Sequence, residues 1–351
     1  MSLRCDPVFR VTPFSIGEMI VKTKRCKIGV LLLLLLLPGC SRQPVEAQVY
    51  AMDTLMTIKL WGSHGETAVQ DLSRLFQEQE AQLSVTRPGS LVDRLNGGQT
   101  VELPEQIQDL FRETLALSNR TGGALDPCLY PVTKLWGFTT GHYRVPEQAE
   151  IQEALAHTGS KQLILKNSCA HLAAGAQMDL GAVGKGWAGR LAAEYLEKGE
   201  GVTGGLLSLG GNVQTYGEKP GGAPWQIGIQ DPAGAGTLGT LSLQGTWAVV
   251  TSGGYQRYFE AGGVRYCHIL DPETGAPARA GLASVTVVAE DGLLADGLST
   301  ALYIMGLEKA SDFWREGRDF EAVFCTEAGT VYVTAGLADR FSGCAFEEIG
   351  P

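Results

Sequence analysis

The chain has 351 residues, of which 44% are hydrophobic and 46 are glycine, so it can bury a substantial core and should contain many tight turns. Its 38 acidic residues outnumber its 28 basic residues, which gives a formal net charge of −10 at pH 7. An acidic surface repels nucleic-acid backbones and anionic lipid headgroups. This charge therefore disfavours nucleic-acid binding and membrane adhesion through a basic patch.

The N-terminal segment has the pattern of an exported lipoprotein. Basic residues between positions 22 and 27 precede the apolar run Ile28–Leu37, which is shorter than the roughly twenty residues that a membrane-spanning helix requires. The run leads into Leu37-Pro38-Gly39-Cys40, the pattern of a lipobox. We therefore expect residues 1–39 to be a cleaved signal peptide, with the true start near Met19 and a diacylglycerol on Cys40. The alternative for the apolar run is a short buried helix.

A lipid on Cys40 would hold the protein at the extracytoplasmic face of the cell membrane, which is the periplasmic side if an outer membrane is present. Residues 40–48 comprise this cysteine and a short polar stretch, which we expect to be a tether. Residues 49–351 contain no obvious linker and no internal repeat. We therefore expect them to form one compact domain.

The remaining cysteines predict free thiols. Beyond the lipidation site they are Cys128, Cys169, Cys267, Cys325 and Cys344. A secreted disulfide framework normally has an even, patterned set, and a zinc site normally contains closely spaced pairs. A single bridge between Cys325 and Cys344 stays open as an alternative.

Hydrophobic periodicity predicts a strand over Thr54–Trp61, followed by amphipathic helices over Glu66–Leu83 and Pro104–Ser118. From Leu206 onward the pattern changes to short β-type runs separated by Gly, Pro and Asp, interrupted by one helix over Asp296–Met305. The β-type runs are Trp225–Ile229, Leu238–Leu243, Trp247–Val250, Ser284–Val288, Ala322–Cys325 and Val331–Val333. Helices and strands in mixed order, without regular βαβ repetition, predict an α+β fold with mixed helices and β-sheets.

Four segments rich in glycine or acidic residues permit close approach of the backbone to a ligand. They are Gly122–Pro127, Asp179–Gly186, Leu209–Asn212 and Ala295–Thr300. A helix that begins near Gly186 would point its positive end at an anion, and a diphosphate is the ligand we expect there. The pair Gly184-Lys185 does not belong to a Walker motif, because Asp179 and Gly186 stand where that motif requires Gly and Ser or Thr.

Two further patterns suggest chemistry. Asp296 and Thr300 are four residues apart, so a helix would present a carboxylate and a hydroxyl on one face, as ligands that suit Mg²⁺. The alternative is an ordinary helix face or an N-terminal cap. His268 is either a general base for an attacking hydroxyl or a core histidine bonded to Asp271. The turn at Thr251–Tyr255 is a candidate phosphate contact.

An ordered series of short motifs carries a resemblance to a known family. The motifs are Met52-Asp53-Thr54, Leu83-Ser84, Arg87-Pro88-Gly89-Ser90, Leu95-Asn96, Gly123–Pro127, Trp136-Gly137-Phe138, Asp179–Gly186, Leu209–Asn212, Thr251-Ser252-Gly253, His268–Gly275 and Ala295–Gly306. In this order they resemble the ApbE family of FAD:protein FMN transferases over nearly all of residues 50–310.

The resemblance implies specific roles for individual residues. The FAD site would be lined by Met52, Thr86, Ala124, Leu125, Asp126, Asp179, Lys185, Ile269 and Leu270. Mg²⁺ would be held by Asp296, Thr300 and the backbone carbonyl of Ala182, with Ser299 in or near its shell, and the catalytic residues would be His268 and Asp296. In this family the metal activates the FAD diphosphate, a Ser or Thr hydroxyl of the target attacks the FMN phosphorus, and AMP leaves. The usual targets are flavin-carrying subunits of membrane redox complexes.

The chain departs from the family pattern at four positions. Thr86 stands where many members have an aromatic residue, Ser299 replaces a carboxylate found in some, and Cys128 and Cys267 stand where hydroxyl residues are common. These positions bear on whether the acceptor is a protein hydroxyl or water. The alternatives are therefore an Mg²⁺-dependent FAD pyrophosphatase, a non-catalytic flavin-binding lipoprotein and a solute-binding lipoprotein. The Asp296/Thr300 pair argues against the last two.

Overall fold

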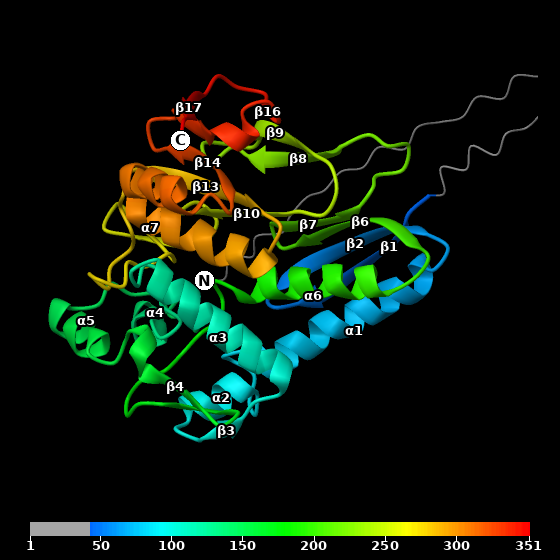
Figure 1. Cartoon of the computed structure of the whole chain (residues 1–351). Coiled ribbons are helices and arrows are strands. Elements are labelled where there is room, and N and C mark those ends of the chain that lie inside the picture. Colours follow the sequence, from blue (N-terminus) through cyan, green and yellow to red (C-terminus); the bar gives the residue numbers. More distant parts are fainter. Residues whose placement is uncertain (1–42) are drawn as a thin grey trace, which may run out of the picture. The chain divides into compact units, whose positions relative to one another are not determined.

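The computed structural model describes residues 43–351 (Figure 1). The predicted signal peptide, the start near Met19 and the lipidation site at Cys40 lie outside the described residues. Within residues 43–351, no helix combines the length and the apolar character that crossing a membrane requires.

A nine-stranded sheet forms the centre of the domain. Its strands are β1 (Val45–Ala51), β2 (Thr54–Gly62), β6 (Val202–Leu209), β7 (Asn212–Gly217), β10 (Ala248–Gly253), β13 (Leu282–Ala289), β14 (Glu321–Thr326), β15 (Val331–Thr334) and β17 (Glu347–Ile349). They lie in the order β1-β2-β6-β7-β10-β13-β14-β15-β17. Neighbouring strands are antiparallel except β15 and β17, which are parallel.

The first strand corrects the predicted tether. The sequence predicts a tether through Gln48, but the structure places Val45–Gln48 in β1, where they pair with β2. Val49 and Ala51 of the same strand are buried, whereas the alternating residues Glu46 and Gln48 face solvent. Because these exposed residues are polar, the sequence shows no clear hydrophobic pattern for this strand. The ordered domain therefore begins closer to Cys40 than predicted.

Helices cover one face of the large sheet, as Figure 1 shows for α1 (Gly65–Leu83), α6 (Gly184–Lys198) and α7 (Gly292–Gly317). The three-stranded sheet β16-β9-β8 packs on the other face; it consists of β8 (Trp225–Gln230), β9 (Thr237–Leu243) and β16 (Phe341–Ser342). Successive side chains of β10 point to opposite faces of the sheet. Val249 packs against the small sheet, and Val250 packs in the cluster that contains α7. Both faces of β10 and β13 are thus buried, which accounts for their continuous apolar runs.

The remaining elements complete the α+β fold. The other helices are α2 (Leu91–Asn96), α3 (Glu105–Arg120), α4 (Tyr130–Trp136) and α5 (Gln148–Leu155). The other strands are β3 (Val101–Glu102), β4 (Leu163–Lys166) and β5 (Cys169–Leu172), which form a small sheet, and the hairpin of β11 (Tyr258–Ala261) and β12 (Val264–Cys267). The predictions of an α+β fold, of helices near α1 and α3, and of the late β-runs are confirmed.

Helix α7 is longer than predicted at both ends. The sequence predicts Asp296–Met305, whereas the helix begins after Asp291, whose carboxylate accepts a hydrogen bond from the N–H of Leu294 at 2.9 Å. Gly306 interrupts the helical dihedral angles with φ of 78°, but the chain then resumes the helix because Ala310 and Trp314 pack into the core.

The prediction of free thiols is confirmed, because none of the five cysteines in the described part of the chain forms a disulfide.

The core on β2 generates a stability prediction. Leu60 is fully buried, whereas Leu55 on the same strand is 54% exposed. Leu60→Ala should lower the free energy of unfolding by about 2–5 kcal/mol, because it removes buried apolar surface and leaves a cavity. Leu55→Ala, the matched control, should change it by no more than about 0.5 kcal/mol. Urea unfolding followed by circular dichroism measures both, and equal losses in the two variants would contradict this description of the core.

Candidate active site

A polar cavity of about 740 Å³ opens where the β1–β2 turn, the N-terminus of α6, the end of β10, the segment after β12 and helix α7 meet. It brings together most of the residues that the sequence analysis assigns to the site. They are Met52, Ala124, Leu125, Asp126, Asp179, Ala182, Lys185, His268, Ile269, Leu270, Asp296 and Thr300. A second hollow of about 340 Å³ beside α1 and α6 contains none of them.

Two predicted residues do not line this cavity. Thr86 lies on the exposed loop between α1 and α2, and its hydroxyl lies 3.2 Å from Oγ of Ser84. Ser299 is fully buried, and its Oγ donates to the backbone carbonyl of Asp296 at 2.8 Å and lies 2.8 Å from Oγ of Ser252. In this geometry Ser299 contacts Ser252 and the backbone of Asp296 rather than the cavity, so its assignment in or near the metal shell stays a prediction.

The β1–β2 turn holds one edge of the cavity in a restricted backbone conformation. Met52 and Asp53 have φ of 52° and 57°, so two consecutive non-glycine residues adopt the left-handed region. Turns of this kind match the twist of an antiparallel hairpin but disfavour side chains other than Gly, Asn or Asp. Flanking strand pairs hold the turn, which keeps the Met52 side chain at the cavity.

Asp296 is the buried carboxylate of the site. Its side chain is only 4% exposed as part of α7, and its Oδ2 accepts a hydrogen bond from the N–H of Gly186 at 2.7 Å. Burial raises the pKa of Asp296, and the positive charge of Lys185 together with the N–H groups of Gly186 and Lys185 opposes that rise. The first turn of α6 thus supplies donors and a favourable dipole for the anionic carboxylate.

The contact between Asp296 and Gly186 depends on glycine in both helices. A Cβ on Gly186 would lie 2.0 Å from the carbonyl oxygen of Gly292 and 2.5 Å from Cβ of Asp296. A Cβ on Gly292 would lie 2.3 Å from the carbonyl oxygen of Gly186. Real Cβ atoms do not make such contacts, so α6 and α7 can approach this closely only where both residues lack a side chain.

The oxygen donors around Asp296 fit a magnesium ion. Ala182 and Thr300 line the same cavity, and the Thr300 hydroxyl lies 3.3 Å from Oγ of Ser252. Within residues 43–351, no group of three His, Cys, Asp or Glu side chains is arranged to hold a metal. A set of one carboxylate, one hydroxyl and one carbonyl suits Mg²⁺, which commonly takes few protein ligands and completes its octahedron with water and substrate phosphates.

Asn212 adds a polar group that the sequence analysis placed only in a glycine-rich cluster. Its side chain is 5% exposed, and its Nδ2 makes no well-formed hydrogen bond within the described part of the chain. The amide nevertheless lies close enough to Asp296 to lower the pKa of that carboxyl group. A buried donor without a regular partner in a ligand-sized cavity is typical of a group that binds a substrate oxygen.

His268 lines the cavity, and one of its ring nitrogens is anchored to the backbone. Its Nδ1 lies 3.1 Å from the backbone carbonyl oxygen of Arg257, which also accepts the His268 backbone N–H at 3.0 Å. Because a carbonyl oxygen only accepts hydrogen bonds, Nδ1 carries the hydrogen and Nε2 keeps its lone pair. The partner of Nδ1 is thus the Arg257 carbonyl and not Asp271, as the alternative of a histidine bonded to Asp271 would require. The Asp271 carboxylate accepts the N–H of Glu273 at 2.8 Å.

The electrostatic surroundings keep His268 neutral. Burial and the positive charges of Arg257 and Lys185 lower its pKa to about 4. Near pH 7 the imidazole is therefore unprotonated and can accept a proton.

Arg257 also lines the cavity, and its Nη2 donates to the carbonyl oxygen of Phe138 at 2.9 Å. Sequence reasoning missed this arginine because it belongs to none of the glycine-rich or acidic clusters.

The segment at Asp126 is a structural part of the cavity wall. Its two carboxylate oxygens accept the backbone N–H groups of Cys128 and Gly159, each at 2.8 Å, and so join two distant loops. Burial raises the pKa of the Cys128 thiol to about 12. This cysteine is therefore an unreactive core residue at neutral pH.

The pKa of His268 can be measured directly. In an NMR titration, the histidine signal that is lost in His268→Asn should titrate near 4, well below the ordinary histidine value of about 6.5. Between these values the unfolded state binds the proton and the folded state does not. The contribution of His268 to stability is therefore full above pH 6.5 and declines as the pH falls toward 4. A His268 midpoint near 6.5 would contradict the proposed surroundings.

The fold matches proteins of known structure. The structure resembles the ApbE protein from Thermotoga maritima with a TM-score of 0.80 and 33% identity, covering 86% of this chain and all of that one. It resembles the flavinyl transferase ApbE from Pseudomonas stutzeri with a TM-score of 0.76 and 31% identity, covering 86% of this chain and 99% of that one.

Sequence relatives agree with the structural match. The FAD:protein FMN transferase of Treponema pallidum (strain Nichols) is 32% identical over 343 residues, covering 90% of this chain and 94% of the relative. The enzyme of that name from Klebsiella pneumoniae (strain 342) is 34% identical over 299 residues, covering 83% of this chain and 92% of the relative. The model of the ApbE family matches residues 52–324, and the chain therefore belongs to the ApbE family.

Proposed function

We propose that this chain is an FAD:protein FMN transferase, which moves FMN from FAD to a Ser or Thr hydroxyl of a partner protein and releases AMP. The relatives that carry this name cover most of the chain. The observation that carries the proposal is one cavity that holds a carboxylate–hydroxyl pair for a metal and a neutral histidine with a free Nε2. A bound cation and a proton acceptor both promote phosphoryl transfer to a hydroxyl.

We assign the steps of the reaction to different groups that line the cavity. The attacking hydroxyl forms a bond to the FMN phosphorus, the bond from that phosphorus to the bridging oxygen breaks, and AMP leaves with the bonding electron pair. Nε2 of His268 accepts the proton of the attacking hydroxyl. Lys185 and Arg257 place positive charge at the same cavity, where negative charge grows on the phosphoryl oxygens.

Asp296, Thr300 and the carbonyl of Ala182 would hold Mg²⁺ in this proposal. When bound, the ion supplies positive charge to the diphosphate and stabilises the leaving phosphate. The chain's own contribution is to fix the Asp296 carboxylate through the N–H of Gly186. Met52, Leu125 and Ile269 offer apolar surface in the same cavity, which suits the rings of FAD.

We further propose that the protein works at the extracytoplasmic face of the cell membrane, anchored through a lipid on Cys40. The basic residues, apolar run and lipobox of the N-terminal segment support this location. An anchored transferase is suited to acceptors that are flavin-carrying subunits of membrane redox complexes. Globomycin treatment of expressing cells should leave the precursor uncleaved if Cys40 is lipidated, and normal processing would contradict the anchor.

The transferase proposal is tested with FAD, Mg²⁺ and a flavin-carrying subunit of a membrane redox complex from the same cell. The measurements are flavin fluorescence on the denatured acceptor and released AMP. The account predicts equal amounts of both products. AMP without labelled acceptor would replace the transferase with an FAD pyrophosphatase, and tight FAD binding without either product would leave a flavin carrier.

Substitution of Asp296 tests the metal assignment. Asp296→Asn should reduce transfer at least about 100-fold, because several kcal/mol of charge stabilisation depend on the metal that this carboxylate holds. Asp312→Asn is the matched control, since Asp312 lies on the same helix with a side chain that is 67% exposed. The control should retain full activity. Undiminished transfer by Asp296→Asn at limiting Mg²⁺ would overturn the assignment.

A further inference from the structure

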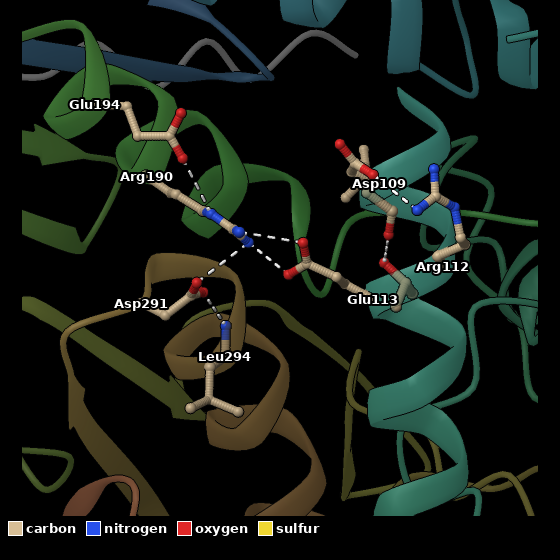
Figure 2. Close-up of polar contacts among 9 residues, drawn as sticks. Asp109, Arg112, Glu113, Arg190, Glu194, Asp291 and Leu294 are labelled. Carbon is tan, nitrogen blue, oxygen red and sulfur yellow. Dashed lines mark hydrogen bonds and ion pairs between the residues drawn. The ribbon is translucent and has the colours of Figure 1, made fainter. Parts of the chain in front are cut away.

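Arg190 forms an ionic junction that joins three helices outside the cavity (Figure 2). Its guanidinium makes two bonds to the carboxylate of Glu113 on α3, with Nη2 lying 3.1 Å from Oε1. Its Nη1 also lies 3.1 Å from Oδ2 of Asp291, the residue before α7, and its Nε lies 3.3 Å from Oε1 of Glu194 on α6. The Arg190 side chain is only 25% exposed and lies over the Trp187 ring at 5.2 Å.

Asp291 connects this junction to the start of α7. One oxygen, Oδ1, accepts the N–H of Leu294 and thereby caps the helix, while the other, Oδ2, faces Arg190. Figure 2 shows the carboxylate of Asp291 between the guanidinium of Arg190 and the backbone of Leu294. Asp291 therefore links the first turn of α7 to Arg190 on α6.

On both helices, the residues of this junction are only a few positions away from the contact between Gly186 and Asp296. Arg190 follows Gly186 by four residues, so the two lie on the same face of α6. Asp291 directly precedes Gly292, whose backbone packs against Gly186, and Asp296 follows on α7. At the glycine contact, the N–H of Gly186 bonds the Asp296 carboxylate. The ion pair between Arg190 and Asp291 adds a second polar link between α6 and the start of α7.

We infer that Arg190 is a positioning residue for the metal site, which holds the start of α7 through Asp291 so that the Asp296 carboxylate keeps its place at the N–H of Gly186. This inference rests on the proposed function only for the identity of the ion. Arg190 itself touches neither substrate nor metal, so it acts on cation affinity through geometry. Removing its charge also leaves three carboxylates facing one another at the junction, which pushes the helices apart.

The inference is tested by calorimetric titration of MgCl₂ into the protein with ADP, the half of FAD that contains the diphosphate and has no FMN to transfer. Arg190→Gln should weaken Mg²⁺ binding about tenfold, the lower end for residues that orient a metal ligand. Asp291→Asn should weaken it similarly, because asparagine still caps the helix but loses the ion pair. The double variant should be no weaker than Arg190→Gln alone, since both substitutions break the same ion pair between Arg190 and Asp291.

Arg112→Gln is the matched control. Arg112 lies on α3 in an exposed ion pair with Asp109 at 3.0 Å, drawn beside the junction in Figure 2, and it should leave Mg²⁺ binding unchanged. In metal-free protein, hydrogen exchange should be faster for the peptide that contains Gly186 in Arg190→Gln than in the control. Arg190→Lys, which keeps the charge but not the planar fork, should lie between Arg190→Gln and the unmodified protein.

A lower melting temperature with unchanged Mg²⁺ affinity and unchanged Gly186 exchange in Arg190→Gln would overturn the inference and leave Arg190 with a role in stability alone. Additive losses in the double variant would also overturn it, because they would separate Arg190 from Asp291. Absence of Mg²⁺ binding in the unmodified protein is a distinct result. It would contradict the metal assignment in the proposed function, and the inference would fall with it.

Discussion

Helices α6 and α7 touch through the backbones of Gly186 and Gly292, and this close crossing is the constraint on which the site depends. Because neither residue has a side chain, the N–H of Gly186 reaches the carboxylate of Asp296 on the other helix at 2.7 Å. The N-terminus of α6 thus stabilises the carboxylate of Asp296 on α7, although that residue is almost fully buried. An alanine at either position would separate the helices and remove the bond.

The charges of the cavity follow from this crossing. Lys185 precedes Gly186, so the same helix start presents a cation beside the Asp296 carboxylate. Lys185 and Arg257 also disfavour protonation of His268, which keeps this residue neutral and able to accept a proton. The cavity therefore offers two cations to an anionic diphosphate, although carboxylates line it as well.

The sequence predicts those parts of the fold and site that depend on local pattern. Helices α1 and α3 carry a clear helical period, and the apolar runs from Trp225 onward form strands because both faces of the central strands are buried. The pair of Asp296 and Thr300 can be identified from the sequence because its i, i+4 spacing lies within one predicted helix. The first half of β1 has no clear sequence pattern because its outward residues are polar, and pairing with β2 determines its structure.

Other features depend on contacts between distant segments and leave no local signal. The backbone carbonyl of Arg257 determines which nitrogen of His268 carries the hydrogen, and no residue pattern around His268 reveals that partner. Ser299 has the right residue type for a metal shell, but the helix turns it toward Ser252. The contacts of Arg190 with Glu113 and Asp291 likewise join residues that are far apart in the chain.

The central claim is that Asp296, Thr300 and Ala182 form one cation site at the crossing of α6 and α7. The most direct measurement is anomalous diffraction from crystals grown with MnCl₂ and ADP, since Mn²⁺ replaces Mg²⁺ and scatters anomalously. The account predicts a strong peak about 2.1 Å from a carboxylate oxygen of Asp296 and beside the Thr300 hydroxyl, bridged to the diphosphate. A bound diphosphate with no peak at Asp296, or a peak held by other residues, would contradict it.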